Sequence, residues 1–411
     1  MSQYFDALET RSAEQRTSAL AVRLPQQIAH AKANTAYFAA SLKQVDATAI
    51  TSAAALAALP VVRKHDLIEL QKLQRPFGGL AASHWGKLSR VFSSPGPIYE
   101  PEGRDTDYWR TARALYAAGF RAGDLVHNGF SYHMTPGAWI MEAGALALGC
   151  TVFPAGVGQT EQQVAAMNDL QPNGYVGTPS FLRILLEKAE ELGIKLPSLT
   201  KALVSGEAFL PPVRDALLAR GVTGYQAYAT AELGVIAYET EAREGLVVDE
   251  GVIVEIVRPG TGDPVAVGEV GEVVVTTFNS DYPLIRFGTG DLSAFLPGIS
   301  PCGRTNMRIK GWMGRADQTT KVKGMFVHPE QVATIVKRHP EIVRARLVVT
   351  NPDSTDLMTL NCEAGAAGGD LEKSIADTVR DVTKLRAEVR LVAAGSLAND
   401  GKVIEDARKY D

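Results

Sequence analysis

Along the middle of the chain, the pattern of apolar and polar positions predicts strands and helices in alternation. Four short apolar runs predict strands, at residues 124–130, 150–156, 174–180 and 201–209. Three segments of helical spacing predict helices between them, at residues 137–149, 161–172 and 180–193. This alternation is typical of a parallel sheet covered by helices on both faces. Ligands of such sheets bind at the carboxyl ends of the strands, so we expect the loops there to form the walls of a site.

The regions that flank this alternation have different patterns. Residues 10–45 have helical spacing, which we expect to break near Pro25. A further helix is predicted over residues 103–119. From about residue 245 the chain is rich in strand-forming residues, which indicates a smaller antiparallel layer.

The fold expected from these patterns is α/β with two domains. Residues 1–316 form a large N-terminal domain of mixed and parallel sheets with helices and a β-rich layer. Residues 317–411 form a small, mobile C-terminal α/β domain. The length of 411 residues agrees with two or three domains, because it exceeds one ordinary core.

Composition and charge exclude several classes of function. The net charge of −4 gives no broad basic surface, which argues against a nucleic-acid partner. No apolar segment reaches the roughly 18 residues of a membrane helix, and the polar start differs from a secretory signal. Cys150, Cys302 and Cys362 lie far apart without metal-binding spacing. We therefore expect a cytoplasmic protein with no membrane partner.

Four motifs follow one another in the second half of the chain: YATAE (228–232), IRFGTGDL (285–292), GRADQTTKVKGMFVHPEQV (314–332) and NDGKVIEDAR (399–408). In this order they resemble the core motifs of the adenylate-forming enzymes. Three more segments resemble the phenylacetate–CoA ligase family, namely YFDALET (4–10), GQTEQQV (158–164) and TPSFL (178–182). The resemblance covers nearly the whole chain. It implies an AMP-forming acid–thiol ligase, which makes an acyl-adenylate from ATP and a carboxylic acid and then acylates coenzyme A.

The resemblance also implies a nucleotide site. Asp291 is similar to the carboxylate that holds the ribose hydroxyls, and Arg315 to the arginine that reaches ribose or phosphate. Glu232 is similar to the acid that positions Mg²⁺ on the phosphates, since a hard cation prefers oxygen ligands. Two segments are expected around the adenine, namely Ser205, Gly206 and Glu207, and Tyr228, Ala229 and Thr230. The alternative for these residues is an ordinary role in turns and helix starts.

The C-terminal motifs imply the residues that act in the two half-reactions. Lys402 is similar to the lysine that stabilises charge on the acyl carboxylate and the α-phosphate during adenylation. Asp317 resembles the hinge about which the last domain turns. Gly324 resembles the position where the backbone meets the pantetheine arm of coenzyme A. Lys321 and Lys323 either attract the phosphates of coenzyme A or form a solvated face.

The acid pocket is expected at the ends of two predicted strands. Phe130, Tyr132, His133 and Phe181 are candidates to line a pocket for an aromatic acid. His133 has an alternative role as a buried structural histidine. The identity of the acid stays open at this point.

The loop SSPGPIYEP, residues 93–101, departs from the pattern of the family. The family's loop reads roughly Ser-Ser-Gly-Thr-Thr-Gly-Lys-Pro and binds phosphate through backbone N–H groups, hydroxyls and the lysine. Here Pro95 and Pro97 supply no N–H, and Glu100 stands where a lysine would be useful. The residues still able to contact phosphate are Ser93, Ser94 and Gly96.

Three functions are compatible with this altered loop. The first is a working aryl-CoA ligase that uses ATP, Mg²⁺ and coenzyme A, with a homodimer left open. The second is an enzyme that uses an adenylate without cleaving ATP, and the third is a non-catalytic protein that binds an acyl or nucleotide ligand. The presence of Asp291, Arg315, Gly324 and Lys402 favours the first, because a protein without catalysis has no physical reason to keep them together.

Overall fold

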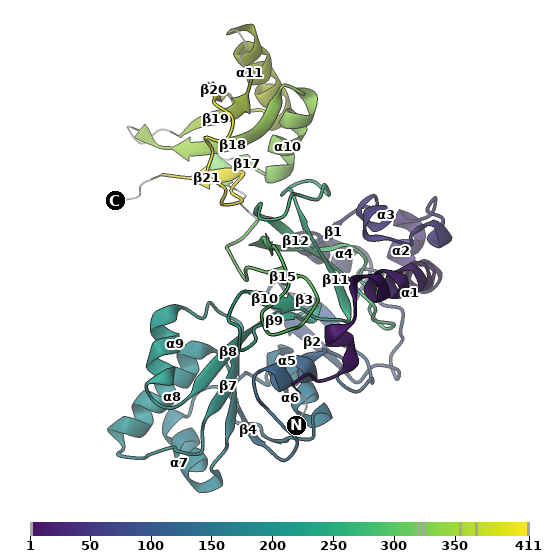
Figure 1. Cartoon of the computed structure of the whole chain (residues 1–411). Helices are drawn as coiled ribbons and strands as arrows, with labels where there is room; N and C mark the ends of the chain where they lie inside the picture. Colours follow the sequence, from purple (N-terminus) through teal and green to yellow (C-terminus); the bar gives the residue numbers. More distant parts are fainter. Residues whose placement is uncertain are drawn as a thin grey trace. The chain divides into compact units, whose positions relative to one another are not determined.

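The structure is a computed structural model that describes residues 3–316, 318, 320–322, 325–352, 356–365 and 369–408. Its contacts divide the chain into two compact units (Figure 1). The first unit comprises Met1–Val254, Val275–Phe287 and Leu296–Trp312, and the second comprises Glu255–Val274, Gly288–Phe295 and Met313–Asp411. The expected hinge, Asp317, lies outside the described residues, so a domain boundary at this position stays a prediction.

A nine-stranded mixed sheet forms the centre of the first unit, in the order β14-β15-β10-β9-β8-β7-β6-β4-β5. Its parallel part consists of β4 (Leu125–Asn128), β5 (Thr151–Phe153), β6 (Gly174–Gly177), β7 (Lys201–Val204) and β8 (Thr223–Thr230). The remaining strands are β9 (Gly234–Tyr238), β10 (Leu246–Val248), β14 (Phe295–Leu296) and β15 (Arg308–Ile309). The direction changes at β8, which pairs with β9 in antiparallel register.

Helices bury both faces of the parallel part, as the apolar runs predict. They are α5 (Thr111–Ala117), α6 (Gly137–Ala147), α7 (Thr160–Leu170), α8 (Pro179–Glu191) and α9 (Pro211–Leu218). Tyr175 of β6 lies in the core that includes residues of α7, α8 and α9, whereas the next residue, Val176, lies in the core that includes residues of α5 and α6. Successive side chains of a strand point to opposite faces, so both faces of the sheet are buried.

Two helices differ from their predicted bounds. Helix α1 (Ala13–Asn34) continues through Pro25 instead of breaking there. Proline has no N–H to donate a hydrogen bond to the carbonyl four residues earlier, which is that of Ala21. Ala21 is exposed, so water can bind this carbonyl in place of the missing N–H and the helix can continue. Helix α5 begins at Thr111, not at residue 103, because Arg110 adopts a left-handed conformation (φ 62°) and the Asp107 carboxylate accepts a hydrogen bond from the Thr111 N–H (2.7 Å).

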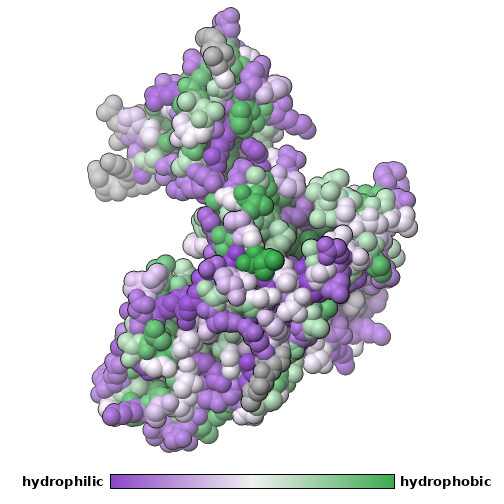
Figure 2. All heavy atoms as spheres, viewed as in Figure 1, coloured by the Kyte–Doolittle hydropathy of each residue, from purple (hydrophilic) through white to green (hydrophobic). Residues whose placement is uncertain are grey.

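The first unit also contains the N-terminal elements and a hairpin. The elements are η1 (Ala7–Thr10), α2 (Ala36–Ser41), η2 (Ala47–Ala49), α3 (Ala53–Ala57), β1 (Val62–Arg63), η3 (Lys64–Asp66) and α4 (Leu67–Leu73). The hairpin consists of β2 (Arg90–Ser94) and β3 (Ile98–Glu102) in antiparallel register. On the visible face, polar and apolar side chains are interspersed, as on most folded proteins (Figure 2).

The second unit contains a four-stranded sheet in the order β20-β19-β18-β21. Its elements are β16 (Thr320–Val322), β17 (Met325–Val327), α10 (Pro329–Arg338), β18 (Ile342–Thr350), β19 (Leu357–Ala364), α11 (Gly369–Thr383), β20 (Glu388–Val392) and β21 (Ile404–Asp406). Four strands have residues in both units, namely β11 (Val252–Val257), β12 (Gly271–Thr277), β13 (Phe287–Ser293) and β14 (Phe295–Leu296).

The α/β fold class is confirmed. The sheet of the second unit has a hydrophobic core of its own, to which α10, α11 and the strands contribute. Within the described ranges, no helix has both the length and the apolar character needed to cross a bilayer.

Candidate active site

The altered phosphate loop is a tight hairpin. Ser94 of β2 pairs with Ile98 of β3, so only residues 95–97 form the turn. Of these three residues only Gly96 has a backbone N–H to offer, because the other two are prolines. The N–H of Ser93 donates to the Met134 carbonyl (2.9 Å). The main-chain donors that a phosphate-binding loop presents are therefore largely missing from this turn.

The pleat of this hairpin separates the two serines. Ser94, Ile98 and Glu100 lie on the buried face, whereas Tyr99 is exposed and Ser93 is half-buried. The Ser94 hydroxyl donates a hydrogen bond to Glu100 Oε1, which lies diagonally across the hairpin on the same face. Ser94 thus holds the Glu100 side chain.

Two glutamates near the candidate site are buried, Glu100 on the inner face of the hairpin and Glu232 after β8. Glu100 is fully buried, and burial raises its pKa to about 8, with a further contribution from the negative charge of Glu232. Glu232 follows β8, and its side chain is also buried. Lys64 Nζ lies 2.8 Å from Glu232 Oε1. The Lys64 ammonium therefore forms an ion pair with Glu232.

Several oxygen atoms of this cluster lack a hydrogen-bond partner among the described residues. They are Glu100 Oε2 and both carboxylate oxygens of Glu232, and two further buried oxygens without a partner are Thr230 Oγ1 of β8 and the Tyr282 hydroxyl. The contact between Lys64 and Glu232 is an ion pair that is not aligned as a hydrogen bond. Burial raises the pKa of Tyr282 well above its usual value, and the negative charges of Glu232 and Glu100 raise it further. Buried polar atoms without partners are costly, which indicates a site for a polar ligand.

The two segments expected around the adenine come together at one edge of the sheet. Ser205 and Gly206 follow β7, and the Ser205 hydroxyl donates to the carbonyl of Ala227 in β8 (2.8 Å). Tyr228, Ala229 and Thr230 form the end of the same β8. Because β7 and β8 are parallel neighbours, their carboxyl ends form one wall.

Gly206 and Glu207 have distinct structural roles in this wall. Gly206 has a positive φ of 85°, and a Cβ there would lie 3.4 Å from the ring of Phe130. The Glu207 carboxylate accepts a hydrogen bond from the N–H of Ser180 in the first turn of α8 (2.6 Å). A contact of this segment with a nucleotide would therefore use its main chain.

The four candidates for the acid pocket have different surroundings. Phe130 packs against the core that includes residues of α5 and α6, whereas Phe181 packs against the core on the other face of the sheet. The Tyr132 hydroxyl donates to Glu142 (2.6 Å) and accepts from Asn128 (2.9 Å). His133 is exposed, so the alternative of a buried structural histidine is wrong.

Asp291 and Arg315 form an ion pair in the second unit. Asp291 lies in β13, and its Oδ1 is 3.0 Å from Arg315 Nη1. The backbones of the two residues also pair as an isolated antiparallel bridge. A ribose diol bound to this carboxylate would share it with the guanidinium. The placement of this pair relative to the residues of the first unit stays a prediction.

Lys402 is an exposed residue in a loop that two polar side chains hold. This lysine loop, residues 398–404, accepts hydrogen bonds from Arg346 of β18 at the carbonyls of Ala398 (3.0 Å) and Lys402 (3.1 Å). Gln318 Nε2 donates to the Gly401 carbonyl (3.1 Å), and its Oε1 accepts from the N–H groups of residues 403 (2.5 Å) and 404 (2.8 Å). The backbone around Lys402 is thus fixed while its side chain stays accessible.

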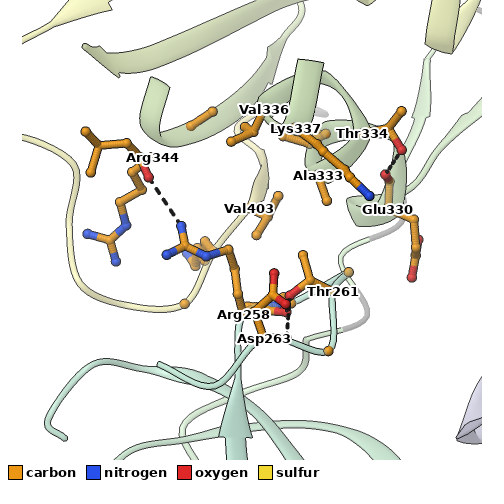
Figure 3. A pocket seen from close by; sticks show the side chains of 18 of the residues that line it. Arg258, Thr261, Asp263, Glu330, Ala333, Thr334, Val336, Lys337, Arg344 and Val403 are labelled. Atoms are coloured by element: carbon orange, nitrogen blue, oxygen red, sulfur yellow. Dashed lines mark hydrogen bonds between the residues drawn. The ribbon is translucent and has the colours of Figure 1, made fainter. Parts of the chain in front are cut away.

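The lysine loop also forms part of a pocket of about 790 Å³ in the second unit. Side chains of Arg258, Lys337 and Arg344 surround this pocket, together with Val403 of the loop (Figure 3). Asp317, Lys323 and Gly324 lie outside the described residues, and of Lys321 only its backbone in β16 is described. Their expected roles in domain rotation and coenzyme A binding stay predictions.

Sequence reasoning missed two members of the carboxylate cluster. Lys64 lies in η3 and Tyr282 lies between β12 and β13, far from Glu232 along the chain. Neither residue belongs to a motif or an apolar pattern that would mark it. Glu100 was visible in the sequence as the residue that replaces a lysine, but its burial beside Glu232 was not.

Comparisons with known proteins agree with this geometry. The model of the AMP-binding enzyme family matches residues 107–279. A phenylacetate-coenzyme A ligase of Aromatoleum evansii is 32% identical over 83% of this chain and 80% of its own length. The corresponding ligase of Thermus thermophilus is 30% identical over 86% of this chain and 82% of its own length.

A solved structure extends the similarity to the whole fold. The open conformation of 2-hydroxyisobutyryl-CoA ligase in complex with 2-HIB-AMP and CoA is 27% identical, with a TM-score of 0.73. It covers 97% of this chain, and this chain covers 92% of it. The sequence identities extend over more than four-fifths of the chain, and the expected motifs occur in order. The chain therefore belongs to the phenylacetate–CoA ligase family of AMP-binding, adenylate-forming enzymes.

Proposed function

We propose that this ligase activates an aryl carboxylic acid of the phenylacetate type with ATP and transfers the acyl group to coenzyme A. The observation that carries the proposal is the identity of 30–32% with phenylacetate-coenzyme A ligases over most of the chain. The aromatic ring of Phe130 beside Gly206, at the wall expected to hold the adenylate, supports an aryl substrate.

The reaction has two steps with separate residues. An oxygen of the substrate carboxylate attacks the α-phosphorus, and the bond to pyrophosphate breaks. The coenzyme A thiol then attacks the acyl carbon, loses its proton, and AMP leaves. We assign Lys402 to the first step, because an exposed ammonium on a fixed loop can approach negative charge that develops at the α-phosphate. Lys321, Lys323 and Gly324 are assigned to the second step.

The nucleotide contacts follow the same assignment. Ser205, Gly206 and Tyr228 would contact the adenine, and Asp291 with Arg315 the ribose and phosphate. Glu232 would hold Mg²⁺, because its buried oxygens, which form an ion pair with Lys64 but accept no hydrogen bond among the described residues, are the hard ligands this ion prefers. When bound, the ion neutralises part of the phosphate charge. Asp317 would be the hinge for the change between the steps.

A second function is favoured by one specific feature, the phosphate hairpin. Its turn offers few groups that could bind pyrophosphate, and an enzyme that starts from an acyl-adenylate would not need to bind pyrophosphate. A cytoplasmic location and a homodimer are further parts of the proposal. Sedimentation of the purified protein would test the dimer.

The release of AMP tests the proposed function. The protein is incubated with ATP, Mg²⁺, coenzyme A and, in turn, phenylacetate, benzoate and 2-hydroxyisobutyrate. We expect AMP and an acyl-CoA with phenylacetate, less with the aliphatic acid, and neither with Lys402→Ala. Lys337→Ala, a second lysine of the same pocket, is the matched control and should stay active.

Two negative outcomes have different meanings. If no acid yields AMP while a relative is active in the same assay, the proposed function is wrong. Synthetic phenylacetyl-adenylate with coenzyme A then decides between the alternatives. Formation of phenylacetyl-CoA would identify an enzyme that uses a preformed adenylate, and its absence would leave a binding protein.

A further inference from the structure

We propose that the first unit holds a second ligand site, which binds a small carboxylic acid in its ionised form. The site is a pocket of about 280 Å³ lined by helix α1, by residues 248–254 and by Phe278. All of its lining residues belong to the first unit, and none of them is assigned above to the nucleotide, the acid or coenzyme A. The inference goes beyond the proposed function and does not depend on it.

Arginine side chains give this pocket its positive charge. Among the described residues its charged lining consists of Arg11, Arg16 and Arg23 with one carboxylate, Glu250, which leaves a net charge of +2. The carboxylate binds the first two arginines, with Oε2 at 2.6 Å from Arg11 Nη2 and Oε1 at 2.8 Å from Arg16 Nη2. Both oxygens of Glu250 are therefore engaged, and the third arginine has no carboxylate of its own in the pocket.

Arg23 is the residue that is available to bind an anion. Within the described ranges its guanidinium makes no hydrogen bond and no ion pair, and it lies over the ring of Phe278, 3.8 Å from the centroid. Stacking uses the face of the guanidinium and leaves the N–H groups at its edge for an acceptor. Burial lowers the pKa of Arg23, and the charge of Arg11 lowers it further, against the opposing effect of Asp249 and Glu250. A bound anion would stabilise this partly desolvated cation.

The other two arginines hold the start of α1 and keep unused donors. Arg16 donates to the carbonyl (3.3 Å) and the hydroxyl (3.1 Å) of Thr305, in addition to its ion pair with Glu250. The Nε atoms of Arg11 and Arg16 are buried, and no described residue accepts a hydrogen bond from either. Buried donors without acceptors are unfavourable and indicate an acceptor that the chain does not supply. These two arginines therefore shape the site, and Arg23 is its main binding group.

The rest of the lining indicates which anion. Its apolar side chains include Leu20 of α1, Val252 and Val254 of β11, and Phe278. Such walls favour a ligand with an apolar body, which an inorganic anion lacks. The volume of about 280 Å³ lies just below the roughly 300–1,000 Å³ of pockets for drug-sized molecules, so the ligand is small. A carboxylate on a short aliphatic or aryl body fits these walls, and its two oxygens match the fork of a guanidinium.

The position of the pocket predicts an effect of the ligand on stability. Helix α1 already holds the segment after β12, since Gln27 Nε2 donates to the Asn279 carbonyl (2.8 Å) and the His30 ring lies 2.8 Å from the Ser280 carbonyl. A ligand bound to Arg23 and to the apolar walls would join these distant segments of the chain at one more point. Binding to the folded state alone raises the unfolding temperature.

Equilibrium dialysis of the full chain with radiolabelled phenylacetate, in the absence of ATP, tests the site. At concentrations that saturate the wild type, we expect Arg23→Gln to bind one equivalent fewer. Arg183→Gln, an exposed arginine on α8, is the matched control and should bind like the wild type. The comparison of variants subtracts any phenylacetate bound at the catalytic site. No binding to the wild type, or the same number of equivalents at the same affinity in Arg23→Gln, would overturn the proposal.

Competition against the Arg23-dependent label tests the class of ligand. Unlabelled hexanoate should displace it, whereas benzyl alcohol and inorganic phosphate at the same concentration should not. Displacement by benzyl alcohol would show that the site needs no anion. Displacement by phosphate would show that it needs no apolar body, and either result would contradict the inference.

Thermal unfolding separates loss of the ligand from misfolding. Phenylacetate should raise the Tm of Arg183→Gln more than that of Arg23→Gln. Arg23→Lys keeps the charge but loses the planar fork, so it should fold normally and bind about tenfold more weakly, and binding as tight as in the wild type would contradict the inference. A protein with the Arg23-dependent site that releases no AMP would keep this inference and overturn the proposed function. AMP release together with identical binding in the wild type and Arg23→Gln would do the opposite.

Discussion

The phosphate hairpin of the first unit and the lysine loop of the second unit are both short connections, but only the hairpin departs from the pattern of the family. The hairpin has lost its family pattern, with two prolines around Gly96 and a buried carboxylate at Glu100. The lysine loop keeps its motif and is held through its main chain by Arg346 and Gln318. A site made of backbone N–H groups is lost when the turn is shortened. A site made of one side chain on a fixed backbone persists as long as that backbone is held.

The sharpest test of this comparison is Lys402→Ala. We expect adenylation to fall about 10²–10³-fold, because a charge contact made in the transition state is lost. The exposed position predicts an unchanged Tm. Pyrophosphate release in single turnovers measures the first step alone. A loss below threefold would mean that the lysine loop has no more catalytic value than the hairpin.

The pH dependence of stability tests the phosphate hairpin, through the buried Glu100. The pKa of Glu100 is raised to about 8 in the folded protein, above its usual 4.5, so the folded state retains a proton that the unfolded state has lost. Stability of the metal-free protein should therefore fall as pH rises from about 4.5 to 8, by an order of 2–5 kcal/mol.

Urea unfolding at several pH values measures this effect. Glu100→Gln carries no titrating group and should flatten the dependence over that window. An equally steep fall of stability in the variant would show that groups other than Glu100 cause the pH dependence.

The support of the lysine loop is tested at Gln318. Gln318→Ala removes three hydrogen bonds to the backbone around Lys402, and we expect about a tenfold lower rate of adenylation from a displaced lysine. Gln318→Glu keeps the acceptor for two of the three bonds and should recover part of that rate. Single-turnover rates and the KM for ATP are measured together. Equal rates in the two variants would show that the clamp does not position Lys402.

The smallest effect is expected at Thr230. Thr230→Val removes a buried hydroxyl without a hydrogen-bond partner in the described ranges, so the free energy of unfolding should stay the same or rise by up to ~1 kcal/mol. The KM for ATP should increase nevertheless, because Thr230 belongs to the segment expected around the nucleotide, two residues before Glu232. Chemical unfolding and ATP titration of the same preparation check both. A loss of stability would mean that the hydroxyl has a structural partner.

The fold was predictable where the pattern of burial repeats. The strands and helices from residue 124 to 209 were predicted because both faces of the sheet are buried, which leaves clear apolar runs. The start of α5 was not, because it depends on the left-handed Arg110 and on the Asp107 side chain, which have no periodic signal. The continuation of α1 through Pro25 depends on water at an exposed carbonyl and was equally hidden.

The candidate site was predictable only where a motif marks it. Asp291 and Arg315 were assigned from separate motifs, and the structure pairs them. The pairing of Lys64 with Glu232 and the approach of Tyr282 depend on tertiary packing of distant segments, which one sequence does not reveal. Glu207 carries a side-chain bond to Ser180 that its motif did not indicate.

The bonds of Gln318 also bear on how this enzyme evolves. They contact the carbonyl of residue 401 and the N–H groups of residues 403 and 404, which every residue except proline provides. These bonds therefore hold the loop whatever side chains stand at these positions, whereas Gly401 (φ 71°) and the buried Ile404 are restricted by their own packing. Homologous lysine loops should keep the lysine and this glycine, and substitutions to proline at 403 or 404 should be rare.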